Sequence, residues 1–189
     1  MSDTRPTVDA LREDILLHSV RTGDFVLKSG QRSGWFIDAK QTLCRPSGML
    51  IAATAVLDVL MDMPALPDAI GGLTMGADPV AFITAGVAAV RGIGLKVFSV
   101  RKEAKDHGSG GTIAGALDAH DKVVVVEDVA TRGASLLQAI KAVSAVGAVP
   151  VLALAIVDRG GVAGELVGSA GVPFRALLSA PELGFEYGG

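Results

Sequence analysis

The chain has 189 residues, half of them hydrophobic and only 4% aromatic, which suits one globular domain with a sizeable core. Its formal net charge of -3 argues against a broad nucleic-acid-binding surface. The N-terminal residues form no apolar signal core, and the apolar stretches fall short of the roughly 18 residues that span a bilayer. We therefore expect a cytoplasmic protein with neither a membrane nor a nucleic-acid partner. The single Cys44 fits a reducing compartment and is expected to be an ordinary packing residue.

The N-terminal part predicts a helix, two short strands and a second helix. Apolar residues recur at helical spacing from Val8 to about Val20, and Gly23 is expected to end that helix. The runs FVL and WFI, within residues 25–39, predict two strands around a Ser/Gly turn, with Trp35 as a packing anchor. A helix is expected over residues 46–61, because Pro46 suits a first helical turn.

From residue 68 onward, strand-like apolar runs alternate with helical segments. Asp78 could cap the first of these helices. This alternation implies right-handed crossovers and an α/β fold with a doubly wound parallel sheet of about five strands. Ligands bind beyond the carboxyl ends of such strands, so we expect a site in the loops at 74–78, 101–111, 127–135 and 158–161. The expected strands are 68–73, 95–100, 122–126, 149–157 and 174–178, and the expected helices are 79–90 and 135–146.

The strongest local signal is the sequence KVVVVEDVATRGASLLQAI at residues 122–140, in which a buried strand leads through a short loop into a helix. Gly133 can take a positive φ and let the loop amides point inward. Together with the helix N-terminus, these amides make an anion site. The hydroxyls of Thr131 and Ser135 add donors for phosphate oxygens. The loop has neither a Walker ending nor the GxGxxG pattern of dinucleotide binding.

Two carboxylates, Glu127 and Asp128, stand beside this anion site, where they would repel a bare phosphate. They make sense when the ligand also offers hydroxyls, as a ribose does, or a bridging Mg²⁺. The loop therefore predicts a sugar phosphate with vicinal hydroxyls. The alternative is an acidic loop followed by an N-capping Ser135, a common arrangement in α/β proteins.

The sequence VVVVEDVATRGAS resembles the loop of type I phosphoribosyltransferases that binds 5-phosphoribosyl 1-pyrophosphate (PRPP). Three further stretches resemble the orotate phosphoribosyltransferase family: FVLKSGQRSGWF (25–36), GGLTMGADPVA (71–81) and RKEAKDHGSGG (101–111). The resemblance covers residues 8 to 183 and implies one phosphoribosyltransferase domain over 1–189, with residues up to about 45 forming a hood. It implies an enzyme of pyrimidine biosynthesis that converts orotate and PRPP into orotidine 5′-monophosphate and pyrophosphate.

The resemblance also assigns residues. Orotate would be bound by Phe36, Thr131 and Arg159, and catalysis would involve Lys102, Lys105, His107 and Asp128. Residues 74–78 would line the pyrophosphate side. Mg²⁺ is implied as a cofactor carried by PRPP, with no direct protein ligands. The implied PRPP-binding residues are Lys28, Arg101, Lys102, Lys105, His107, Glu127, Asp128, Val129, Ala130, Thr131, Arg132, Gly133, Ala134 and Ser135.

The physical properties of residues 101–107 support this assignment. Three fixed positive charges and two negative ones gather there in an acidic chain, where they would stabilise a leaving pyrophosphate. In the family, some of these residues come from the neighbouring subunit, so the resemblance implies a homodimer with shared active sites. The chain departs from the family's usual sequence at three positions. Arg132 stands where the family has a small residue, and it would either point outward or add charge near the phosphate. Ile37 replaces a second aromatic residue, and Asp38 replaces an asparagine, each found in some members.

Two other functions remain open. One is a phosphoribosyltransferase for a purine or another base, against which the KSG stretch and Arg159 argue. The other is a PRPP-sensing regulator without chemistry, against which the retained RKEAKDHG stretch and the lack of a basic stripe argue.

Overall fold

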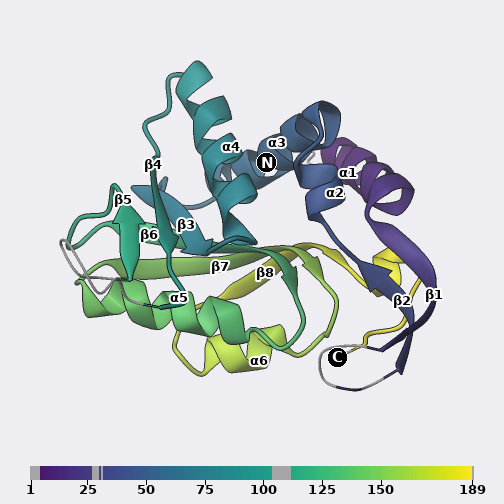
Figure 1. The fold of residues 1–189 in the computed structure, drawn as a ribbon. Helices are drawn as coiled ribbons and strands as arrows, with labels where there is room; N and C mark the ends of the chain where they lie inside the picture. Colours follow the sequence, from purple (N-terminus) through teal and green to yellow (C-terminus); the bar gives the residue numbers. More distant parts are fainter. Residues whose placement is uncertain (1–4, 27–29, 31, 104–111, 189) are drawn as a thin grey trace.

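The computed structural model describes residues 5–26, 30, 32–103 and 112–188. Figure 1 shows a central sheet with helices on both faces and a two-stranded hairpin beside it. None of the described helices is long and apolar enough to cross a membrane. Three residues predicted to bind PRPP lie outside the described ranges: Lys28, Lys105 and His107.

The strands of the central sheet are β3 (Ala69–Leu73), β4 (Lys96–Val100), β5 (Ile113–Gly115), β6 (Lys122–Ala130), β7 (Val149–Asp158) and β8 (Phe174–Ser179). Their order is β5-β4-β3-β6-β7-β8, and all neighbours are parallel except the β4–β5 pair. This confirms the predicted doubly wound sheet with five parallel strands. β6 lies at the centre, where the four valines 123–126 are completely covered on both faces.

Helices cover the sheet in two layers, shown above and below it in Figure 1. The upper layer packs into one apolar cluster with the hairpin, and the lower layer packs into a second cluster on the other face. The upper layer contains α1 (Arg5–His18), α2 (Lys40–Leu43), α3 (Pro46–Met61) and α4 (Ala77–Val90), and the lower layer contains α5 (Ala134–Ala145) and α6 (Ala163–Gly168). The short helix η1 (Pro181–Leu183) follows β8.

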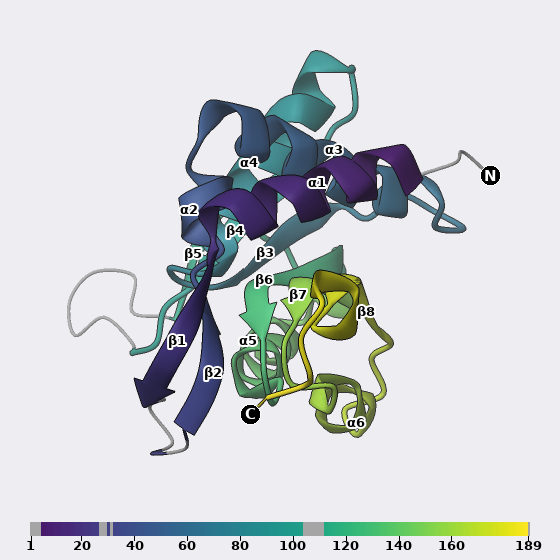
Figure 2. The same cartoon turned by 90° about the vertical axis from the view of Figure 1, so that its right-hand side faces the viewer.

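The hairpin consists of β1 (Val20–Val26) and β2 (Arg32–Ile37), which pair antiparallel. It projects beyond the sheet, next to the carboxyl ends of β6 and β7 (Figure 2). The two predicted strands are confirmed, but the first helix ends at His18 and not at Gly23, because β1 begins at Val20. Trp35 and Ile37 alternate with exposed neighbours and turn inward, so the packing role expected for Trp35 is confirmed.

Three further predictions are wrong. β6 continues to Ala130, so the two carboxylates lie within the strand and not in a loop. Asp78 does not cap α4: its carboxylate accepts hydrogen bonds from the hydroxyls of Thr74, at 2.6 Å, and Ser99, at 2.7 Å. Cys44 is exposed and not packed; it is the C-cap of α2, in the short connection to α3.

Candidate active site

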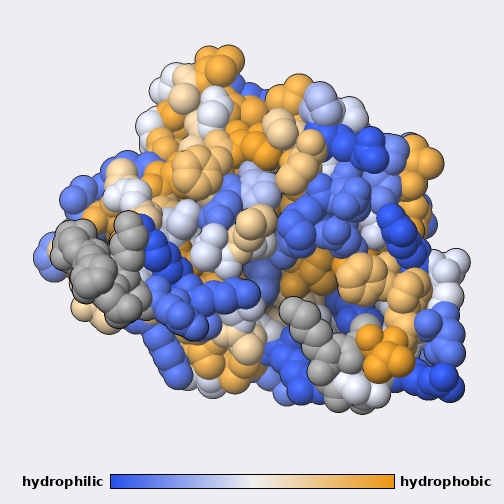
Figure 3. Space-filling model, in the orientation of Figure 1, coloured by the Kyte–Doolittle hydropathy of each residue, from blue (hydrophilic) through white to orange (hydrophobic). Residues whose placement is uncertain are grey.

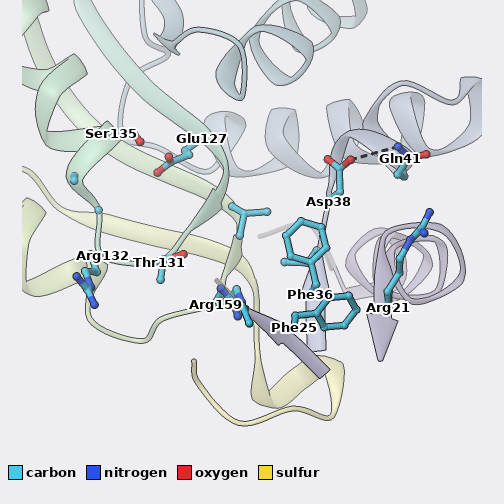
Figure 4. Close-up of a pocket in the computed structure, with 15 residues that line it drawn as sticks. Arg21, Phe25, Phe36, Asp38, Gln41, Glu127, Thr131, Arg132, Ser135 and Arg159 are labelled. Carbon is cyan, nitrogen blue, oxygen red and sulfur yellow. Dashed lines mark hydrogen bonds between the residues drawn. The ribbon is translucent and has the colours of Figure 1, made fainter. Parts of the chain in front are cut away.

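A pocket of about 830 Å³ opens between the hairpin and the carboxyl ends of β6 and β7. Figure 4 shows the side chains of the hairpin on one side and those of the β6–α5 connection on the other, with Arg159 near the base. On the molecular face drawn in Figure 3, hydrophilic side chains gather across the centre, beneath apolar surface over α3 and α4. The lining residues are Arg21, Phe25, Val26, Phe36, Ile37, Asp38, Gln41, Glu127, Val129, Thr131, Arg132, Gly133, Ala134, Ser135 and Arg159.

The turn between β6 and α5 has the geometry of an anion site. Gly133 has φ of 78°, as predicted, and a Cβ there would come within 3.0 Å of the Ala163 carbonyl oxygen. Glycine is therefore required both by its dihedral angle and by the close approach of α6. Gly133 is also the N-cap of α5, and no side chain caps this end, so the predicted alternative of an N-capping Ser135 is wrong. The first amides of α5 are available to an anion.

Glu127 projects from β6 towards this turn and is partly buried. Burial raises the pKa of its carboxyl from 4.5 to about 7. A hydrogen bond with the Ser135 hydroxyl acts in the opposite direction, and the charge of Asp128 adds to the rise. The pocket therefore contains a carboxyl group that titrates near neutral pH.

Asp128 alternates to the other side of β6, is 8% exposed, and does not line the pocket. Its carboxylate accepts a hydrogen bond from Lys40 Nζ at 3.1 Å, and Lys40 also pairs with Asp38 at 2.9 Å. Although burial acts to lower it, these two carboxylates hold the pKa of Lys40 above its ordinary value. The backbone at Gly76 lies so close to Asp128 that a Cβ there would clash with its carboxylate. Asp128 thus faces the 74–78 loop, and Lys40 ties it to the hairpin side of the pocket.

Arg159 follows β7 and is 7% exposed. Its guanidinium donates to the Ser33 hydroxyl at 3.2 Å and lies 5.1 Å from the centre of the Trp35 ring. Burial lowers the pKa of Arg159 from its ordinary value, without removing its charge at neutral pH. Its Nε is buried and has no partner among the described residues. An arginine fixed in this way retains donors for an anionic ligand.

An aromatic wall faces Arg159 across the pocket. Phe25 and Phe36 come from the two hairpin strands, and their ring centroids lie 5.8 Å apart. Phe36 is 40% exposed, so its ring is available to a planar ligand. Asp38, at the end of the same hairpin, accepts a hydrogen bond from the Gln41 side chain at 3.3 Å.

The structure brings many of the predicted residues together, but not all of them. Arg132 is exposed at the edge of the pocket, and Ala130 is buried beneath it, its carbonyl accepting the Arg159 backbone N–H at 2.8 Å. Arg101 and Lys102 do not line the pocket; Arg101 is half-buried at the end of β4, and Lys102 is exposed.

Sequence reasoning missed five residues of the site: Arg21, Phe25, Val26, Lys40 and Gln41. Phe25 and Val26 lie within the FVLKSGQRSGWF stretch but were given no role of their own, and Lys40 and Gln41 carry no motif. A signal for Arg21 is the hairpin register, in which it pairs with Phe36 across β1 and β2. Residues opposite a predicted ligand contact on a neighbouring strand share its surroundings.

A doubly wound sheet with an adjacent Glu–Asp pair on a central strand, a glycine turn at a helix N-terminus and an antiparallel hairpin beside it is the fold of a type I phosphoribosyltransferase. No family model matches the chain. The chain is 38% identical over 187 residues to orotate phosphoribosyltransferase of Streptomyces avermitilis, covering 98% of this chain and 100% of the relative. It is 35% identical over 175 residues to that of Rhodopirellula baltica, covering 89% of each.

Solved structures agree. Crystal structures of Mycobacterium tuberculosis H37Rv orotate phosphoribosyltransferase match 95% of this chain and 100% of theirs. The complex with Fe(III) dicitrate has a TM-score of 0.83 and 32% identity, and the complex with PRPP has a TM-score of 0.79 and 28% identity. The chain belongs to the orotate phosphoribosyltransferase family.

Proposed function

We propose that the protein transfers the ribose 5-phosphate group of PRPP to orotate, giving orotidine 5′-monophosphate and pyrophosphate in pyrimidine biosynthesis. One observation carries the proposal: a single pocket joins the anion site at Gly133, the carboxyl of Glu127 and the part-satisfied guanidinium of Arg159. A sugar phosphate and an acidic base would each find a complementary surface there.

PRPP would occupy the β6–α5 side. The backbone of residues 130–135 and the hydroxyls of Thr131 and Ser135 would hold the 5′-phosphate, and Arg132 at the pocket edge would add a positive charge. Glu127 and Asp128 would accept hydrogen bonds from the ribose hydroxyls. Because Asp128 faces the 74–78 loop, the pyrophosphate would extend towards that loop.

Orotate would occupy the hairpin side. It is a planar anion, and an arginine guanidinium pairs with a carboxylate through two parallel hydrogen bonds. Arg159 would make that pair, Phe36 would stack on the ring, and Thr131 would contribute a polar contact.

Catalysis would rest on positioning and electrostatics, without a covalent nucleophile. The bond from the anomeric carbon to pyrophosphate loosens, positive charge builds on the ribose ring, and the orotate nitrogen attacks the opposite face. Carboxylates at the ribose favour that positive charge. Basic side chains would stabilise the leaving pyrophosphate: Lys28, Arg101, Lys102, Lys105 and His107.

Mg²⁺ would enter bound to PRPP. Among the described residues, no group of three or more acidic, histidine or cysteine side chains could hold a metal ion by itself. The residues present fit a metal held by the substrate's own oxygens, since the carboxyl of Glu127 in the pocket adds negative charge near the ion without the protein having to bind it directly. The ion would neutralise pyrophosphate charge.

We further propose a cytoplasmic homodimer with shared active sites. Exposed apolar side chains on the upper helical layer and the loop before α4 support an interface: Leu50 on α3 is 57% exposed, Phe82 on α4 58%, and Met75 in the loop 68%. If Lys105 acts across the interface, mixing a Lys105→Ala chain with an Asp128→Ala chain will restore activity at hybrid sites. No recovery in verified heterodimers would contradict subunit sharing.

The reaction is tested directly by mixing the protein with orotate, PRPP and Mg²⁺ and following orotate loss by its near-ultraviolet absorbance. Uracil and adenine serve as parallel substrates, and EDTA as the metal-free control. We expect loss of orotate alone, abolished by EDTA. No turnover of orotate would overturn the proposal, and PRPP binding in the same sample would then point to another base or to a regulator.

A further inference from the structure

The last described residues, 184–188, pack against the base of the pocket. The Phe185 ring stacks on Trp35 with centroids 4.6 Å apart and an interplanar angle of 14°. The Gly188 backbone N–H donates to the Arg159 carbonyl at 3.0 Å. In both cartoon views this segment runs alongside the hairpin (Figures 1 and 2).

The same segment also covers the turn that follows Arg159. A Cβ added at Gly161 would lie 2.8 Å from the Tyr187 ring, so the ring rests directly on the backbone of that turn. A Cβ at Gly160 would in turn clash with the Thr131 carbonyl. The tail therefore packs against the 160–161 turn, and that turn packs against the β6–α5 connection at Thr131. Neither contact leaves room for a side chain at Gly160 or Gly161.

Trp35 connects the tail to the guanidinium. It contacts Phe185 by ring stacking and Arg159 by a cation–π contact, and it is only 6% exposed. The hydrogen bond from Arg159 to Ser33, two residues earlier on β2, fixes the guanidinium a second time. The guanidinium is thus held by the face of the Trp35 ring and by one hydrogen bond from a nitrogen. A long, flexible arginine side chain fixed at two points keeps little rotational freedom, so its remaining N–H donors keep their direction.

We propose that the tail 184–188 is a positioning element for Arg159: by stacking on Trp35 and closing over the 160–161 turn, it holds the guanidinium in the orientation that binds the acidic base. The inference rests on the proposed function, in which Arg159 recognises the orotate carboxylate. No residue of the tail lines the pocket, so it acts through Trp35 and Arg159. It sets the affinity for orotate and leaves the affinity for PRPP unchanged.

The test compares two partly buried phenylalanines. Phe185→Leu removes the stacked ring, whereas Phe174→Leu removes a ring that packs on α6 in the apolar cluster on the other face of the sheet, away from Trp35. We expect Phe185→Leu to raise KM for orotate about tenfold with KM for PRPP unchanged, because a displaced binding group weakens one substrate only. Phe185→Tyr keeps the stacked ring and should restore the parental KM. Phe174→Leu should change neither KM.

A second readout is independent of turnover. Trp35 is the only tryptophan of the chain, so tryptophan fluorescence reports on the surroundings of this one ring. Phe185→Leu and Tyr187→Ala should both shift its emission to longer wavelength and increase quenching by acrylamide. Tyr187 is 50% exposed, so its variant keeps the test valid even if Phe185→Leu does not fold.

The outcomes separate the two claims. If the parent protein does not turn over orotate, the proposed function fails. If the parent is active and both tail variants keep the parental KM for orotate, the positioning role is overturned and the proposed function stands. Equal rises in both KM values would also overturn it, because they would indicate general loosening of the pocket.

Discussion

At the scale of single residues, the carboxyl of Glu127 connects the pocket to pH. Its pKa of about 7 in the folded chain, against an ordinary 4.5, means that the folded state holds more protons than the unfolded state between these pH values. The stability of the substrate-free protein therefore falls as pH rises through this window, by at most about 3 kcal/mol. Asp38 and Lys40 do not titrate in this window, because the pKa of Asp38 is lowered and that of Lys40 is raised from their ordinary values.

The corresponding variant is Glu127→Gln, which removes the titration. Urea unfolding at pH 5 and pH 8 should show a smaller loss of stability in the variant than in the parent. An identical loss in both proteins would mean that burial does not perturb Glu127. The same ionisation should favour ribose binding, so we also expect KM for PRPP to fall from pH 6 to pH 8 in the parent more than in the variant.

Lys40 is the second residue with a distinct expected effect. It neutralises Asp128, whose buried carboxylate would otherwise stand unpaired beside the proposed ribose position. Lys40→Met should lower kcat/KM about tenfold or more, equivalent to about 1.4 kcal/mol of transition-state stabilisation.

A matched control exists for this variant. Lys96 also bridges two carboxylates, Asp118 at 2.8 Å and Asp121 at 2.6 Å, but at the amino end of β4, away from the pocket. Lys96→Met also removes a lysine from between two carboxylates, so it should lower the stability of the fold about as much as Lys40→Met does. It should leave kcat/KM within about twofold of the parental value. Equal losses of activity in both variants would mean that Lys40→Met acts only by destabilising the fold and not at the active site.

At the scale of elements, the β6–α5 turn depends on Gly133. Alanine there would adopt an unfavourable left-handed φ, at a cost of about 1–2 kcal/mol, and would press on the Ala163 carbonyl. We expect Gly133→Ala to raise KM for PRPP, because the turn amides would move away from the phosphate.

Gly92→Ala separates strain from site geometry. Gly92 has φ of 74° with nothing within 4 Å of an added Cβ, so the backbone cost is similar but no ligand contact is involved. Thermal unfolding should report a loss of stability for both variants, and KM for PRPP should rise only for Gly133→Ala. Unchanged PRPP binding by Gly133→Ala would contradict the phosphate assignment.

At the scale of the whole molecule, the exposed apolar surface of the upper helices supports self-association. A charge at its centre should oppose dimer formation, because burying an unpaired carboxylate is costly. We expect Phe82→Asp to shift the mass measured by light scattering towards the monomer. Val146→Asp is the control, since Val146 is 48% exposed at the end of α5, in the lower helical layer. Parental mass for Phe82→Asp would place the interface elsewhere.

The sequence by itself determined the elements and the site that lie within continuous motifs. The buried valines of β6, the carboxylate pair and Gly133 follow one another along the chain, so period, burial and turn chemistry predicted their geometry locally. The strand after Glu127 was missed because continued pairing with β7 overrides the polar sequence.

Only the tertiary structure decided which distant residues meet. Lys40 and Asp128 are 88 positions apart, and Ser33 and Arg159 are 126 apart; no local propensity encodes such contacts. Phe185 and Trp35 likewise meet only because the chain returns past the hairpin after β8. The raised pKa of Glu127 is also a tertiary property, because desolvation depends on everything packed around the carboxyl and not on its neighbours in sequence.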